Sequence, residues 1–234
     1  MASIELSDGA PIAVPLHLRT ERGRPTPPAE LRADGRILIG KPQIRHLTAD
    51  SFPDDRELSG FIASEASRCD YYLLGLSCTL ISDEQESLAL AWLRVNLIST
   101  GTGDDEPVAH SLDPLLLDEI RTLSYSVKLT VPCVITPEFA IQGERRTHQA
   151  AVTALGEGQS SFAWEFREIP GRPPHGVQRL RAVIRMPSSG TAEARIDAGA
   201  TIRHRRLNMN AFSYFAPPKQ LPDALTIVLR RQGV

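Results

Sequence analysis

The sequence predicts an all-β fold: an antiparallel β-sandwich with Greek-key-like connections, one short helix and an extended proline-rich N-terminal arm. Three observations support this prediction. Apolar side chains alternate with a period of two over several stretches, as in half-buried strands. Glycine- and proline-rich turns separate these stretches at intervals of roughly 8 to 14 residues, a spacing typical of sandwiches and barrels. No internal repeat or second domain boundary is visible, so we expect an arm over residues 1–36 and one domain over residues 37–234.

The arm is defined by its prolines at positions 11, 15, 25, 27 and 28. Proline removes a backbone donor and favours extended geometry at the residue before it, so a helix is excluded over residues 23–28. One edge strand is expected near residues 10–18.

The first strands of the domain are predicted over residues 36–47, with a Gly-Lys-Pro kink, and over residues 71–80. Between residues 88 and 97 the apolar set shifts from Leu88, Leu90 and Trp92 to Leu93, Val95 and Leu97. This slip predicts a β-bulge, and a helix over residues 84–93 is the alternative.

The short helix is predicted over residues 115–123, because Asp113 suits the N-cap and Pro114 suits the first turn. Strands are then expected over residues 125–135, 149–155, 162–166, 177–186, 192–202 and 225–229. Trp92 and Trp164 are expected to form opposite walls of the core.

Charge is distributed very unevenly along the chain. Residues 1–120 hold 20 acidic and 10 basic side chains, whereas residues 121–234 hold 8 acidic and 16 basic ones. A basic region attracts anions, and an acidic region attracts cations or basic surfaces. The asymmetry therefore points to a charged partner or to contacts between protomers.

The late strands carry charged side chains on their polar faces. Glu165 and Arg167 lie on one strand, Arg179, Arg181 and Arg185 on the next, and Glu193, Arg195 and Asp197 on the third. If the three strands are neighbours, cross-strand ion pairs are expected; the alternative is an anion-binding face.

A basic cluster and an aromatic segment are the candidate binding sites. The predicted patch for an anion or a partner comprises Arg145, Arg146, His148, Arg203, His204, Arg205 and Arg206. Phe212, Tyr214 and Phe215, beside two prolines, are expected either to cap the core or to contact a partner.

No motif predicts catalytic residues, metal ligands or a cofactor. The chain lacks the Gly-x-Ser-x-Gly, His-Glu-x-x-His, Cys-x-x-Cys and Walker spacings. Acidic loops near residues 54–55, 83–86 and 104–106 leave calcium as an alternative. Three cysteines, an odd number, together with a start that lacks secretory features and no membrane-spanning stretch, favour the cytoplasm.

The sequence is most consistent with a protein that binds rather than catalyses. We expect an assembly module that engages a protein partner, or its own protomers, through complementary charged surfaces. A nucleic-acid-binding protein with an arginine-rich patch is the first alternative. A hydrolase whose site combines histidines and carboxylates from distant segments is the second.

Overall fold

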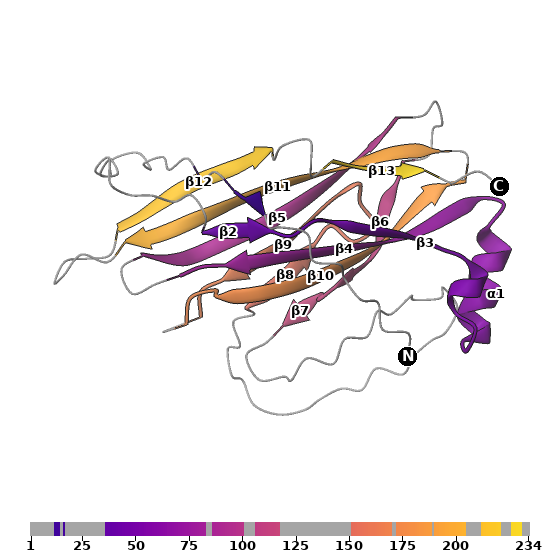
Figure 1. Ribbon diagram of the computed structural model, residues 1–234, viewed down its shortest axis with the longest axis horizontal. Coiled ribbons are helices and arrows are strands. Elements are labelled where there is room, and N and C mark those ends of the chain that lie inside the picture. The colour runs from indigo at the N-terminus through magenta and orange to yellow at the C-terminus, as the bar shows by residue number, and fades with distance from the viewer. Residues whose placement is uncertain are drawn as a thin grey trace.

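A computed structural model describes residues 12–14, 16, 36–82, 86–100, 106–117, 151–169, 172–188, 190–204, 212–220 and 226–230; for the strand over residues 212–220 it describes the backbone alone. The described strands form two antiparallel sheets stacked face to face, which confirms the predicted all-β sandwich (Figure 1). Within the described residues no helix is both long and apolar enough to cross a membrane.

The first sheet has the strand order β1-β2-β4-β10-β6, and β3 pairs with β4 beyond the end of β2. Its strands are β1 (Ile12–Ala13), β2 (Ile37–Ile39), β3 (Gln43–Leu47), β4 (Cys69–Leu80), β6 (Val108–Asp113) and β10 (Gly176–Pro187). The pairing of β1 with β2 confirms the edge strand expected near residues 10–18. Val14 and Leu16 are buried, and apart from these two residues and Arg36 the rest of the predicted arm lies outside the described residues.

The second sheet has the order β12-β11-β5-β9-β8-β7, and β13 pairs with the same edge of β11 as β12. Its strands are β5 (Glu86–Ser99), β7 (Leu116–Leu117), β8 (Val152–Leu155), β9 (Ser161–Arg167), β11 (Thr191–His204), β12 (Phe212–Gln220) and β13 (Thr226–Arg230). The strand expected over residues 125–135 lies outside the described part of the chain.

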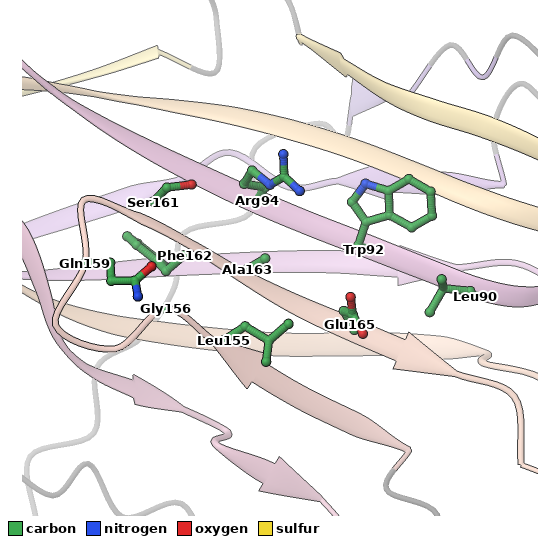
Figure 2. Close-up of a pocket in the computed structure, with 10 residues that line it drawn as sticks. All are labelled: Leu90, Trp92, Arg94, Leu155, Gly156, Gln159, Ser161, Phe162, Ala163 and Glu165. Atoms are coloured by element: carbon green, nitrogen blue, oxygen red, sulfur yellow. The ribbon is translucent and has the colours of Figure 1, made fainter.

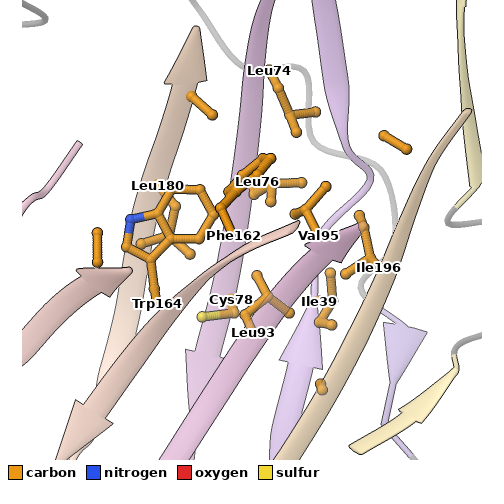
Figure 3. Close-up of a cluster of buried hydrophobic side chains, with 14 of the residues drawn as sticks. Ile39, Leu74, Leu76, Cys78, Leu93, Val95, Phe162, Trp164, Leu180 and Ile196 are labelled. Atoms are coloured by element: carbon orange, nitrogen blue, oxygen red, sulfur yellow. The ribbon is translucent and has the colours of Figure 1, made fainter. Parts of the chain in front are cut away.

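The core fills the space between the two sheets (Figure 3). Its apolar side chains come from alternate positions along the strands. Leu74 and Leu76 of β4 face Phe162 and Trp164 of β9 across this space, and each of these four side chains is at most 2% exposed. Full burial of one large apolar side chain contributes about 1.5–3 kcal/mol. These alternating segments therefore fix which face of each strand points inward.

The predicted bulge in β5 exists, but it lies earlier than the apolar slip suggested. The register of β5 on β11 shifts between the Leu90 and Leu88 pairs, so Ala89 is the extra residue. Beyond it, Ala91 and Leu93 face the core and Trp92 faces outward. The expectation that Trp92 and Trp164 form opposite core walls is wrong, because β5 and β9 are neighbours in one sheet and the two indoles lie on opposite faces.

The helix is also in a different place. Residues 113–117 end β6, pass through a cis Asp113–Pro114 bond and form β7, so the helix predicted from Asp113 is wrong over this part. The α-helix α1 instead spans Arg56–Glu65, and the Asp55 carboxylate caps it by accepting a 3.0 Å hydrogen bond from the Leu58 amide. Leu58, Phe61 and Ile62 share one side of the helix and pack onto the outer face of the first sheet.

The two sheets are joined along one margin by backbone hydrogen bonds. The Ala109 amide of β6 donates to the Gln159 carbonyl at 2.9 Å, and the Gly158 amide donates to the Ala109 carbonyl at 2.7 Å. Gly156 and Gly158, with φ of 91° and 78°, form the turn that makes this approach. The link holds the β8–β9 turn against the first sheet.

Candidate functional site

The outer face of the first sheet carries a group of arginines that we call the arginine face: Arg45, Arg179, Arg181 and Arg185. Alternation along β10 brings three of them to this side, and β3 contributes Arg45. Arg181 lies in register between Gly75 of β4 and Asp113 of β6, and Arg179 lies opposite Ser77. The sheet therefore gathers basic residues from two distant segments on one face.

The floor of the arginine face is made of small residues. Gly75, Ser77 and Thr79 follow one another on the outer side of β4. Gly40 packs so closely on Ser77 that a Cβ added to it would stand 2.2 Å from the Ser77 Oγ. The backbone between β2 and β3 therefore runs close to the sheet, and the floor stays shallow beside the guanidinium groups.

Few acidic groups of the described chain neutralise this face. Asp113 is half-buried, and desolvation raises its pKa while the Arg181 charge acts in the opposite direction. Arg45 and Arg179 are exposed and form no ion pair with any described residue. Two of the four guanidinium groups are thus available to an anion.

Helix α1 covers one end of the same face and carries the opposite charge. Asp54, Asp55 and Glu57 at its start are exposed, while its apolar side packs on Tyr71 and Val183. In Figure 1 the helix lies at the end of the sandwich where β4 begins. An acidic end and a basic stretch therefore follow one another along one surface.

The outer face of the second sheet is balanced in charge. Ion pairs join Arg167 to Glu165 at 2.6 Å and Arg195 to Glu193 at 3.0 Å, each within one strand. The expected cross-strand pairing of β9, β10 and β11 is wrong, because β10 belongs to the first sheet while β9 and β11 lie in the second. The arginines of β10 are consequently separated from the acids that were expected to neutralise them.

A groove of about 490 Å³ runs along the outer face of the second sheet (Figure 2). Its floor is Ala163 of β9, and Arg94 of β5 and Leu155 of β8 stand on either side in register. The remaining lining comes from β5, from β9 itself and from the β8–β9 turn: Leu90, Trp92, Gly156, Gln159, Ser161, Phe162 and Glu165. No sequence motif pointed to this groove.

The predicted basic patch is described only in part. Arg145, Arg146, His148, Arg205 and Arg206 lie outside the described residues. Arg203, at the end of β11, forms a 2.5 Å ion pair with Glu168, whose side chain is 11% exposed. This pair offsets the Arg203 charge that the prediction assigned to an external anion.

The aromatic segment belongs to the edge strand β12. In β12, Phe212, Tyr214 and Phe215 lie in register with His204, Ile202 and Thr201 of β11. Pro217 and Pro218 lie opposite Gly199, where the register of the two strands shifts. Proline has no backbone N–H donor, and an edge strand such as β12 tolerates the loss of this donor. The side chains of β12 and of His204 are outside the description, so their roles as cap or partner contact stay predictions.

One histidine–carboxylate pair lies at the end of the core. His46 Nε2 is 3.3 Å from Asp70 Oδ1, the Asp70 side chain is 4% exposed, and its Oδ2 has no hydrogen-bond partner among the described residues. His175 instead accepts a 3.4 Å hydrogen bond from the Ser82 amide. The part of the chain that is described contains no cluster of three or more residues suited to hold a metal ion.

The chain matches no protein-family model, and comparison with curated proteins gives no match. The functional assignment therefore depends on the two surfaces described above. The arginine face combines residues that were singled out on β10 with Arg45, which was not. Only knowledge of which strands pair could have brought these four residues together.

Proposed function

We propose that this protein acts by binding, as an assembly module whose arginine face holds an acidic protein surface. The observation that carries the proposal is the presence of Arg45 and Arg179, exposed and without ion pairs among the described residues, on a floor of small side chains. Charge-assisted contacts from guanidinium groups to carboxylates are strong and directional. Such a face would orient a partner and accelerate its encounter.

The partner that the described surfaces support best is a second copy of the chain. The exposed Asp54, Asp55 and Glu57 at the start of α1 complement the arginine face of another molecule. Because these two surfaces are different parts of one protomer, the contact would be heterologous, and it would build rings or open chains rather than two-fold dimers.

Light scattering on purified protein at about 50 mM and about 500 mM NaCl tests this proposal, because high salt screens contacts between exposed charges. We expect oligomers at low salt that dissociate at high salt and are lost in the Arg45→Glu/Arg179→Glu variant. Arg94→Glu is the matched control, since Arg94 is an exposed arginine on the other sheet; it should assemble as the unaltered protein does.

A charge exchange sharpens the test. Each variant alone has like charges on its two surfaces and should not self-associate. Mixing the Arg45→Glu/Arg179→Glu variant with an Asp54→Arg/Glu57→Arg variant should restore both possible contacts and give assemblies in which the two chains alternate. A monodisperse monomer at every concentration would contradict the self-assembly proposal. Salt-sensitive retention of RNA or heparin that the same double variant abolishes would favour the nucleic-acid alternative instead.

A further inference from the structure

The groove on the second sheet owes its depth to one small residue. Ala163 on β9 lies in register between Arg94 on β5 and Leu155 on β8. Because directly opposite residues in antiparallel strands share a face, a methyl group stands between two long side chains. This difference in length leaves a groove between them, and Figure 2 shows the side chains that line it. The groove volume of about 490 Å³ is typical of sites for small molecules.

The lining on the Leu155 side is apolar and open to solvent. Leu155 is 48% exposed, and the partly exposed Ala163 methyl lies beside it in register. Solvent-accessible leucine and alanine side chains in a concave site gain free energy when they are covered by an apolar group. The groove therefore has a side suited to a hydrocarbon body.

Most polar side chains beside the groove are already bound to one another. Arg167 Nη2 donates to the Glu165 carboxylate at 2.6 Å. The Ser161 hydroxyl donates to Asn96 Oδ1 at 2.8 Å, and Asn96 Nδ2 donates in turn to Asp197 Oδ2 at 2.8 Å. The Glu165 carboxylate and the Ser161 hydroxyl, which line the groove, therefore both have partners.

Arg94 is different. It is exposed, lines the groove beside the Trp92 indole and forms no hydrogen bond or ion pair with the residues that the structure describes (Figure 2). Asp197, its register neighbour on β11, is bound by Asn96 instead. A guanidinium group with unused donors at one side of an apolar groove is complementary to a carboxylate attached to a hydrocarbon.

We propose that this groove binds a small organic carboxylate with an apolar body. The two carboxylate oxygens accept hydrogen bonds from Arg94, and the hydrocarbon covers Ala163 and Leu155. This site lies on the opposite side of the sandwich from the arginine face, so it is separate from the proposed assembly function.

The test uses hexanoate and its neutral counterpart hexanamide, titrated into the ¹⁵N-labelled full chain and followed by NMR. A ligand of this size in an open groove is expected to bind with a Kd of about 1 mM. Hexanoate should shift the amide signals of residues 94, 155 and 161–163, and hexanamide should bind about tenfold more weakly because it lacks the charge that Arg94 complements.

Three variants separate the charge from the shape. Arg94→Gln should weaken hexanoate binding about tenfold and leave hexanamide binding unchanged. Ala163→Leu should abolish binding of both compounds by filling the groove. Arg68→Gln, which changes an exposed arginine between α1 and β4 outside both surfaces, is the matched control and should bind hexanoate as the unaltered chain does. Equal affinity for the two compounds, undiminished binding by Arg94→Gln, or no shifts at about 20 mM hexanoate would overturn the proposal.

Discussion

The indole of Trp92 lies over Gly199, its register partner on the neighbouring strand β11. A Cβ added to Gly199 would stand 2.4 Å from Cζ2 and 2.6 Å from Cε2 of the indole. The missing side chain thus makes room for the largest aromatic group on the outer face of the second sheet. Trp92 is only 9% exposed there although it does not face the core.

Gly199→Ala should therefore lower the free energy of unfolding by about 1–3 kcal/mol, because the new methyl group overlaps the indole and forces it to move. Urea denaturation followed by tryptophan fluorescence measures the change. Gly60→Ala is a control of opposite sign: Gly60 lies on the exposed side of α1 with open space around it, so alanine should stabilise the protein by about 0.5–1 kcal/mol. A neutral effect of Gly199→Ala would contradict the close approach.

The His46–Asp70 pair should be coupled energetically. Removing the imidazole in His46→Ala leaves the buried Asp70 carboxylate without a described partner, at a cost of about 1–3 kcal/mol. In the Asp70→Asn background the same change should cost less, because a neutral amide loses less than a carboxylate does. A double-mutant cycle from chemical denaturation measures the difference, and strictly additive effects would show that the contact contributes nothing.

Cys78 should be inert in the folded protein. Burial raises the pKa of its thiol to about 12, and the side chain is 1% exposed. At pH 8 the thiol is therefore protonated and shielded, whereas the thiolate is the reactive form. In a Cys69→Ser/Cys133→Ser variant we expect reaction with Ellman's reagent only as fast as the protein unfolds. Rapid native-state labelling, comparable with that in urea, would contradict this packing.

His110 should make stability depend on pH. It lies at a β-bulge edge-on to Tyr71, with ring centroids 5.5 Å apart. Burial lowers its pKa, the Arg185 charge lowers it further, and Glu157 acts in the opposite direction. Between the ordinary histidine pKa of about 6.5 and the lower folded value, the unfolded chain binds more protons, so stability falls as the pH falls through this window.

His110→Gln should flatten this dependence. Denaturation of the two proteins at several pH values between about 7.5 and 5 gives the slopes. As the pH decreases, the unfolding free energy of the variant should increase relative to that of the parent. Parallel profiles would mean that His110 has the same pKa in the folded and unfolded chains.

Prediction succeeded mainly for features that depend on residues close together in the sequence. The alternation that puts Phe162, Trp164 and Phe166 on one face is encoded within seven residues, and the structure confirms it. The helix was missed although local signals were present: Asp55 at the N-cap, and Leu58, Phe61 and Ile62 at helical spacing. Its ten residues lie between strands, and Pro114 offered a more conspicuous but misleading start signal.

The candidate surfaces depended on information that no short segment carries. Arg179 and Arg181 were singled out as outward-facing, but their neighbours were assigned wrongly, because β10 crosses to the first sheet between β9 and β11. The groove likewise needs Arg94, Leu155 and Ala163 in one row, and these come from three strands.

The amino-acid sequence alone determined that this chain forms strands, which alternate side chains of each strand are apolar, and that acidic and basic residues are segregated along its length. Tertiary structure decided which strands pair, and hence which charges meet and which remain unmatched. The physical reason is that side-chain alternation is a local property of an extended backbone, whereas strand pairing depends on contacts between segments far apart in the chain.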